Sequence, residues 1–526
     1  MKKRKKGTDT EILYLLPKKK RSLIHLLFSR TALIILLIIL QLGIFHSLYN
    51  NLKDYFEWFE IAFGAFSVLM VFHLFSIDMD STAKLSWLLI LMIAPVPGAI
   101  FMLFTEKDLG HRAFIGRMRE LTHETKNIIP QDNAILQDND VSDSGTAALH
   151  KYLNKSGCFP IYQNTSLRYF PVGEDKYSAM LNELRKAKDF IFLEYFIIEE
   201  GIMWGHILKI LADKVREGVD VRVMYDGMCE VILLTSDYPT RLQSLGIKCK
   251  PFSRIYPFIS TNYNYRDHRK ILVIDGKTAF TGGVNLSDEY INEIDKFGHW
   301  KDTAIMLKGD AVKSFTLMFL QIWNITEKSP EWDRFINIES ERVTDGYIMP
   351  YCDSPLDNYK VGEMVYIDIL NRAKRYVHIM TPYLILDNEL ETALKFAAQR
   401  GVDVKLIIPG IPDKMAIYAL SKSYCKYLID AGVEIYEYSP GFVHAKVFVS
   451  DDEKAVVGTI NLDYRSLYHH FECAAYILGS KCIANIEADF NKTLKKCRRI
   501  DHNIIKHEKI IFKATGNIMR LAAPLY

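Results

Sequence analysis

The sequence lacks the cysteine patterns of small metal-binding and redox modules. Its 526 residues include eight cysteines, and none of them belongs to a Cys-x-x-Cys pair. This absence excludes a zinc ribbon and a thioredoxin-type redox site. The scattered thiols are typical of reduced side chains in a domain that faces the cytoplasm.

Charge of one sign is also lacking. The chain has 66 Lys and Arg against 63 Asp and Glu, a formal net charge of +3. Overall charge therefore indicates no particular partner. Basic residues nevertheless crowd positions 2–6 and 18–21. We interpret residues 1–22 as a basic cytoplasmic tail that meets anionic lipid headgroups, with nucleic acid as the alternative partner of the tail.

Three hydrophobic segments lie within residues 23–104. Segments 31–48 and 85–104 carry no Asp, Glu, Lys or Arg and are long enough to span a bilayer, and segment 61–76 is uncharged but short. No Ala-x-Ala cleavage site follows the first segment, which favours an uncleaved anchor. Each segment alone could be a buried helix of a soluble domain. Three of them in succession predict N-terminal transmembrane helices.

The flanking charges give conflicting indications of topology. The basic tail places the N-terminus inside, and Arg112, Arg117 and Arg119 place the chain after residue 104 inside as well. Three full spans cannot satisfy both indications. One segment, either 61–76 or the proline-interrupted 85–104, is therefore expected to be re-entrant or interfacial. We favour a catalytic domain on the cytoplasmic side.

A repeated α/β pattern follows residues 105–150, which are polar and are interpreted as a linker. The apolar periodicity predicts a strand, a helix and a strand twice, at 190–198, 203–217 and 219–227, and again at 376–383, 390–400 and 402–410. Duplication is the simplest explanation. We therefore expect two repeated halves, residues 151–340 and 341–500.

One set of polar residues occurs in both halves. His268, Lys270, Asp275 and Asn285 recur at the same spacing as His444, Lys446, Asp451 and Asn461. If residues 268–274 form a strand, His268 and Lys270 point to the same face. His, Lys and Asn together can hold a phosphate, with the lysine as a point charge and the imidazole as nucleophile or proton donor.

The aspartate of the first set belongs to a turn signal. Asp275-Gly276 separates two apolar runs and predicts a hairpin whose second strand is 278–281. On the residues alone, Asp275 is therefore structural or a partner for a cation. Gly283 allows the backbone to approach a neighbouring group closely.

The pattern resembles the HKD motif of the phospholipase D superfamily, His-x-Lys-x4-Asp-x6-Gly-Gly-x-Asn. The first copy matches in full, and the second departs only at Thr459, which replaces the second glycine. Residues 441–446 and 461–466 are most similar to bacterial cardiolipin synthases, and the resemblance covers roughly residues 150–500. It implies two phospholipase D-like α/β sandwich halves related by a pseudo-twofold axis, in a multi-pass protein of the bacterial plasma membrane.

The resemblance also implies roles for individual residues. The catalytic set would be His268, Lys270, Asp275, His444, Lys446 and Asp451, with Asn285 and Asn461 binding phosphate. In the family the first-motif histidine is usually the nucleophile, which suggests His268, with His444 as acid and then base. The residues alone do not separate these two roles.

Supporting residues are expected around the two histidines. An attacking imidazole needs its other nitrogen oriented, usually by a carboxylate. Glu472 and its counterpart Asp302 are expected to do this, and the alternative is that they are salt-bridged acids at strand ends. Gly283 and Ser466 are expected to support the site.

Displacement at phosphorus explains why two half-sites are needed. A neutral imidazole attacks while a protonated one gives its proton to the departing alkoxide. No cluster with recognisable metal-ligand spacing accompanies the motif, and two lysines can neutralise the phosphate charge. We therefore predict a reaction without metal or cofactor. The resemblance implies a phosphatidyltransferase that makes cardiolipin and glycerol from two phosphatidylglycerol molecules through a phosphatidyl-histidine intermediate.

Several alternatives stay open. The acceptor could be water, giving a phospholipase D, or serine, giving a phosphatidylserine synthase. A membrane-tethered phosphodiesterase or nuclease uses the same chemistry, and a retired site would leave a non-enzymatic membrane organiser. A nuclease should show a basic, aromatic-lined groove. We predict no nucleic-acid partner, because aromatic residues and not basic ones dominate the insertion at 254–265.

Two segments outside the motifs, residues 254–265 and 501–526, are rich in apolar side chains. The insertion at 254–265 predicts either an apolar mouth for acyl chains or a packed loop. Residues 501–526 mix basic and apolar side chains and predict either an interfacial amphipathic helix or a surface helix of the catalytic domain. The oligomeric state is left open, and phosphatidylglycerol and anionic membrane lipid are the expected partners.

Overall fold

The computed structural model describes residues 11–15, 39, 43, 46–47, 56–107, 112–254, 265–340 and 343–525. The predicted basic tail 1–22, the hydrophobic segment 31–48 and the aromatic insertion 254–265 lie largely outside these ranges.

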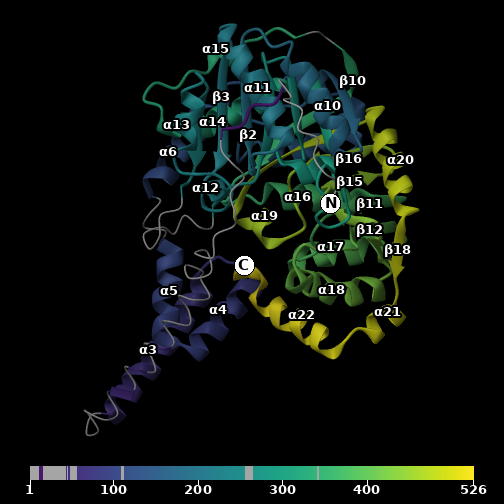
Figure 1. The fold of residues 1–526 in the computed structure, drawn as a ribbon. Helices are drawn as coiled ribbons and strands as arrows, with labels where there is room; N and C mark the ends of the chain where they lie inside the picture. The colour runs from purple at the N-terminus through teal and green to yellow at the C-terminus, as the bar shows by residue number, and fades with distance from the viewer. Residues whose placement is uncertain are drawn as a thin grey trace.

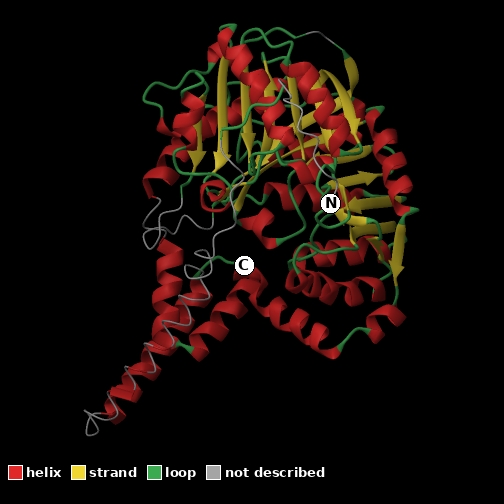
Figure 2. Cartoon of the chain, in the orientation of Figure 1, coloured by secondary structure: helices red, strands yellow, loops and turns green. Residues whose placement is uncertain are grey.

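One long β-sheet joins the two halves of the chain (Figures 1 and 2). The first half supplies β1 (Tyr162–Phe170), β2 (Phe190–Tyr195), β3 (Asp220–Asp226), β4 (Lys248–Phe252), β6 (Lys270–Ile274), β7 (Thr278–Gly282) and β9 (Ala304–Gly309). The second half supplies β10 (Thr344–Asp353), β11 (Tyr376–Met380), β12 (Asp403–Pro409), β13 (Glu434–Tyr438), β15 (Val447–Ser450), β16 (Lys454–Gly458), β17 (His470–Leu478) and β18 (Cys497–Ile500).

The strand order is the same in both halves, read outward from the centre. β1 and β10 pair antiparallel in the middle. The first half then continues β9-β7-β6-β2-β3-β4, and the second continues β17-β16-β15-β11-β12-β13 before the additional β18. Each half therefore places its motif hairpin, β6-β7 or β15-β16, at the same position in the sheet.

Helices cover this sheet. The first half contributes α10 (Gly173–Leu184), α11 (Ile202–Arg216) and α14 (Val312–Trp323), and the second contributes α16 (Val361–Arg372), α17 (Asn388–Gln399), α18 (Met415–Asp430) and α20 (Cys482–Leu494). The predicted strand-helix-strand segments are thus present in both halves. All eight cysteines are unpaired, and six of them are buried.

The segment interpreted as a linker contains ordered helices. These are α6 (Arg112–Glu124), α7 (Asn133–Leu136), α8 (Asn139–Asp143) and α9 (Thr146–Leu153). Met118 and Leu121 of α6 and Leu149 and Leu153 of α9 are buried in the main core. These apolar side chains, spaced three or four apart, bind the segment to the body of the protein.

The N-terminal helices form a small separate core. α3 (Phe56–Ser76), α4 (Ser81–Ile93) and α5 (Pro95–Lys107) pack around Met70, Leu74, Trp87, Leu91, Ala99 and Met102. Proline lacks the N–H that would continue α4, so segment 85–104 divides at Ala94 into two helices. Among the described residues, no helix is both long enough and apolar enough to cross a bilayer. The predicted transmembrane helices are therefore not confirmed.

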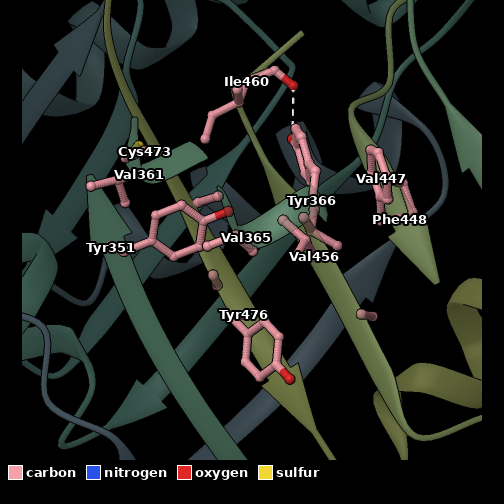
Figure 3. Close-up of a cluster of buried hydrophobic side chains, with 14 of the residues drawn as sticks. Tyr351, Val361, Val365, Tyr366, Val447, Phe448, Val456, Ile460, Cys473 and Tyr476 are labelled. Atoms are coloured by element: carbon pink, nitrogen blue, oxygen red, sulfur yellow. Dashed lines mark hydrogen bonds between the residues drawn. The ribbon is translucent and has the colours of Figure 1, made fainter. Parts of the chain in front are cut away.

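A core cluster in the second half fixes the backbone beside the second motif. Figure 3 shows Tyr366 of α16 packed against Phe448 of β15, with ring centroids 4.0 Å apart. The Tyr366 hydroxyl donates to the carbonyl of Ile460 at 2.9 Å. Since Ile460 precedes Asn461, this buried hydrogen bond connects core packing to a candidate phosphate-binding residue.

The two motif aspartates lie at the hairpin turns, away from the histidines. Asp275 has φ +53°, and its carboxylate accepts from the backbone N–H groups of Lys188, Asp189 and Phe190 at 2.8–2.9 Å. Asp451 does the same for the N–H groups of residues 374–376 at 2.7–2.9 Å. Both side chains anchor the start of the neighbouring strand.

We expect Asp275→Ala to lower the free energy of unfolding by about 2–3 kcal/mol, because three backbone donors lose their acceptor and alanine is strained at positive φ. Asp275→Asn, which keeps one acceptor oxygen and tolerates this φ, should lose less. Chemical denaturation of both variants measures the difference. Loss of turnover in a fully folded Asp275→Ala protein would contradict a purely structural role.

Candidate functional site

His268 is held by the other half of the chain. It lies between β5 (Arg266–Asp267) and β6, and β5 pairs with β17. Its backbone N–H donates to the carbonyl of Phe471 at 2.9 Å. Its Nδ1 is 2.9 and 3.0 Å from the two carboxylate oxygens of Glu472, which is fully buried.

His444 repeats this arrangement in the opposite direction. It lies between β14 (Gly441–Val443) and β15, and β14 pairs with β8 (His299–Lys301) of the first half. Its backbone N–H donates to the carbonyl of Lys301 at 2.7 Å, and its Nδ1 is 2.7 Å from Oδ2 of the buried Asp302. Each half therefore supplies the carboxylate that orients the histidine of the other half.

Two buried lysines accompany the histidines. Lys270 Nζ donates to the carbonyl of His268 at 2.5 Å, and Lys446 Nζ lies 2.9 Å from Nδ1 of His444. Both side chains are almost fully inaccessible to solvent. Burial lowers the pKa of Lys270 to about 8 and that of Lys446 to about 7.

Both histidines are neutral at pH 7. Burial, together with the charges of Lys270 and Lys446, lowers the pKa of His268 well below 6.5. Burial and Lys446 lower the pKa of His444 to about 4, against the opposing effect of Asp302. A neutral His268 that donates Nδ1–H to Glu472 keeps its lone pair on Nε2, which is the state that a nucleophile requires.

The two motif asparagines differ in their hydrogen bonds. Asn285 Oδ1 accepts from the N–H of Ile197 at 3.1 Å, and its Nδ2 donates to the Tyr290 hydroxyl at 2.8 Å. Asn461 is also buried, but its Oδ1 has no hydrogen-bond partner in the part of the chain that the structure describes. The amide nitrogen of Asn461 hydrogen-bonds Asp463, so the free atom of this side chain is an acceptor.

The second motif has Thr459 where the first has Gly283, and the neighbouring carboxylates explain this difference. A Cβ at Gly283 would lie 2.0 Å from Oδ1 of Asp302, so no side chain fits there. At the matching position Thr459 places its hydroxyl against Oε2 of Glu472, and its Oγ1 accepts from the N–H of Cys473 at 3.0 Å. Thr459 thus adds a hydrogen bond to the carboxylate that orients His268.

Comparison with known proteins identifies the family of the chain. Residues 180–323 and 366–494 match the family model described as cardiolipin synthase, PLD-like domain. The chain belongs to this family. An uncharacterised protein of Streptococcus mutans is 56% identical over 86% of this chain and 99% of its own length. A cardiolipin synthase of Alkalihalophilus pseudofirmus is 32% identical over 84% of this chain and 89% of its own.

A solved structure shows the same fold. The crystal structure of phosphatidylserine synthase from Haemophilus influenzae superposes with a TM-score of 0.56 at 14% sequence identity, and covers 72% of this chain and 97% of its own. At this identity the likeness concerns the mixed α/β fold of the family alone.

Ser466 and the two motif aspartates are the remaining predicted site residues. Ser466 donates its backbone N–H to Asp463 at 2.9 Å, and its buried hydroxyl has no partner among the described residues. Asp275 and Asp451 are not brought to the histidines. The structure thus gathers the two His–Lys pairs, both asparagines and both orienting acids, but not the motif aspartates.

Aromatic rings and a third histidine, His470, also lie beside the two motif histidines, and the sequence patterns did not predict them. The ring of Phe196 is 5.0 Å from that of His268, and Tyr290 and Trp300 each lie 5.4 Å from His444. His470 lies 5.4 Å from His268. Trp300 and His470 each stand two residues before an orienting acid, which is a signal that alternation along a strand could have supplied.

Two groups of described residues could share a metal ion, namely His268, His470 and Glu472, and Glu363, Asp387 and Glu389. The first group already holds the Nδ1 hydrogen bond of His268. In the second group Lys360 lies 3.6 Å from Glu363, so a cation is already present beside it. The expectation of a reaction without metal stays a prediction.

We expect a tetrahedral oxyanion such as orthovanadate to raise the melting temperature, because Lys270 and Lys446 gain a counter-charge. Lys446→Met should remove at least half of this rise. Lys250→Met, a lysine bound instead to Glu327 and the carbonyl of Trp323, is the matched control and should keep it. Thermal denaturation with and without the anion measures the effect. An undiminished rise in Lys446→Met would place the anion elsewhere.

Proposed function

We propose that the protein is a phosphatidyltransferase that makes cardiolipin and glycerol from two phosphatidylglycerol molecules. The proposal rests on two hydrogen bonds, each between a histidine of one half and a carboxylate of the other. These are His268–Glu472 and His444–Asp302, and two buried lysines lie beside them. Membership of the cardiolipin synthase family supports this substrate class.

The first step forms a phosphatidyl-histidine. Nε2 of His268 attacks phosphorus, the P–O bond to the headgroup glycerol breaks, and His444 gives a proton to the leaving glycerol oxygen. Glu472 stabilises the positive charge that develops on the imidazole of His268. In the second step His444 removes the proton from a hydroxyl of another phosphatidylglycerol, whose oxygen attacks phosphorus as the P–N bond breaks.

Charge balance supports the acid role of His444. With both histidines neutral, Lys270 and Lys446 balance Asp302 and Glu472. A phosphodiester adds one negative charge, which favours protonation of His444 and offsets the depression of its pKa in the free site. The two lysines would hold the non-bridging oxygens. Asn285, whose side chain is engaged within the protein, can offer only its second amide hydrogen.

Location and domain organisation complete the proposal. We assign the two phospholipase D-like repeats to residues 151–340 and 341–500, related by a pseudo-twofold axis, as the matching strand orders suggest. The hydrophobic segments within residues 23–104 would anchor them at the bacterial plasma membrane, with the catalytic part on the cytoplasmic side. A site at the membrane interface would favour an alcohol acceptor over water.

The first test uses the purified protein in detergent with phosphatidylglycerol as the only lipid and a chelator present. We expect cardiolipin and glycerol by mass spectrometry, and a loss of at least about 10³-fold in His268→Ala, because the nucleophile is absent. His299→Ala, at a histidine bonded to Tyr438, is the control. Phosphatidic acid alone would mean that water is the acceptor, and turnover lost on chelation would contradict the metal-free reaction.

The pH dependence gives a second test. The charges of Lys446 and Lys270 are lost as pH rises through about 7 and about 8, whereas His268 stays neutral to well below pH 6.5. His444 must take up a proton to act as the acid, and its pKa in the free site is about 4, so we expect kcat/KM to keep rising as pH falls below 6.5 and to fall steeply above pH 7–8. Lys446→Arg, if active, should move the alkaline limb upward. A profile that rises through pH 6.5 and stays level to pH 9 would refute this assignment.

A further inference from the structure

The C-terminal helix exposes apolar residues on the side that faces away from the protein. α22 (Ile510–Ala522) packs on α18 through Gly516, where a Cβ would lie 2.4 Å from the carbonyl of Ala419. On the opposite side Ile510 is 86% exposed, Ile511 75% and Ile518 68%. A helix on the surface of a soluble protein normally presents polar residues there.

The neighbouring helix α4 presents the same kind of face. Trp87 and Leu91 are buried against α3 and α5, while the outward positions are the exposed side chains of Leu85, Leu89, Met92 and Ile93. The Ser86 hydroxyl donates to the carbonyl of Leu521, the last large apolar residue of α22, which is itself 56% exposed. The last turn of α22 therefore contacts the N-terminal half of α4, and Figure 1 shows the C-terminal end of α22 beside α4.

The helix is fixed rigidly to the catalytic body. Arg520 pairs with Glu391 of α17 at 2.7 Å, and its guanidinium lies 4.2 Å from the ring centroid of Tyr424 of α18. Phe512 packs against Tyr418 of α18 with ring centroids 5.9 Å apart. A helix held in this way presents its outward face at a fixed angle to the site.

Basic residues border the apolar face. Lys506 and Lys509 are exposed, and Lys513 is half-buried, with its Nζ donating to the carbonyl of Lys506. The neighbouring acid Glu508 is 3.3 Å from Lys422, so its charge is already matched. Apolar side chains with a cationic border fit a bilayer that carries anionic headgroups.

We propose that the outward faces of α22 and α4 lie in the interface of an anionic lipid bilayer and orient the catalytic halves against it. This inference rests on the proposed function, because it places the site at the surface that contains its lipid substrate. The apolar side chains enter the headgroup boundary, and Lys506, Lys509 and Lys513 contact lipid phosphates.

The test is photo-crosslinking in the full-length chain, because the N-terminal segments could hold the protein on vesicles without α22. Benzoylphenylalanine replaces Ile518, and the protein is reconstituted in vesicles of phosphatidylglycerol and phosphatidylcholine. We expect covalent lipid adducts by mass spectrometry at this position. Val343, 41% exposed and directly before β10, is the control and should give none.

Charge and function are tested separately. The double change Lys509→Glu and Lys513→Glu should lower the adduct yield several-fold in phosphatidylglycerol vesicles and leave it unchanged in pure phosphatidylcholine. The double change Ile511→Ser and Ile518→Ser should raise KM on vesicles about tenfold while turnover of monomeric short-chain phosphatidylglycerol stays the same.

The outcomes distinguish this inference from the proposed function. Crosslinks from position 518 to a second copy of the chain, or no crosslinks at all, would overturn the bilayer surface even if cardiolipin is made. Adducts to lipid without any cardiolipin formation by the wild-type protein would leave the surface in place and refute the proposed function.

Discussion

Two lysines and two carboxylates are buried together between the halves of the chain, and the rest of the site depends on the balance of their charges. Removing an ion from water costs several kcal/mol unless another charge or a hydrogen bond compensates for it. Here Asp302 and Glu472 are each bound to a histidine, and Lys270 and Lys446 lie beside the same rings. Burial keeps the imidazoles neutral. An anion that enters the cluster must therefore bring a proton with it or draw one onto a ring.

The same scaffold carries two unequal half-sites. Gly283 leaves room for the short side chain of Asp302, whereas Thr459 adds a hydroxyl beside the longer Glu472. Asn285 is bonded within the protein, whereas the Oδ1 of Asn461 has no partner among the described residues. The two motifs thus occupy matching positions in the sheet but have different side chains around them. This difference suits a reaction in which one histidine attacks and the other carries the proton.

Much of the arrangement could be predicted from the sequence, because periodicity and spacing are local. The strands of both halves, the hairpin turn at Asp275 and the set of paired polar residues all follow from alternation and from repeated intervals. The pairing of each histidine with the carboxylate of the other half could not be predicted, since it depends on how β5 meets β17 and β14 meets β8. The order within residues 112–153 was missed because short apolar patterns there, such as Met118 and Leu121, are weak beside many polar residues.

The exchange of carboxylates has a consequence for the history of the chain. A single half, folded alone, would have a histidine without its orienting acid and an acid without its histidine. An ancestor of one half could therefore have assembled a complete site only as a pair of identical subunits, each completing the other. Within one chain the two halves need not be identical, so Thr459 can occupy one side while the opposite side has Gly283.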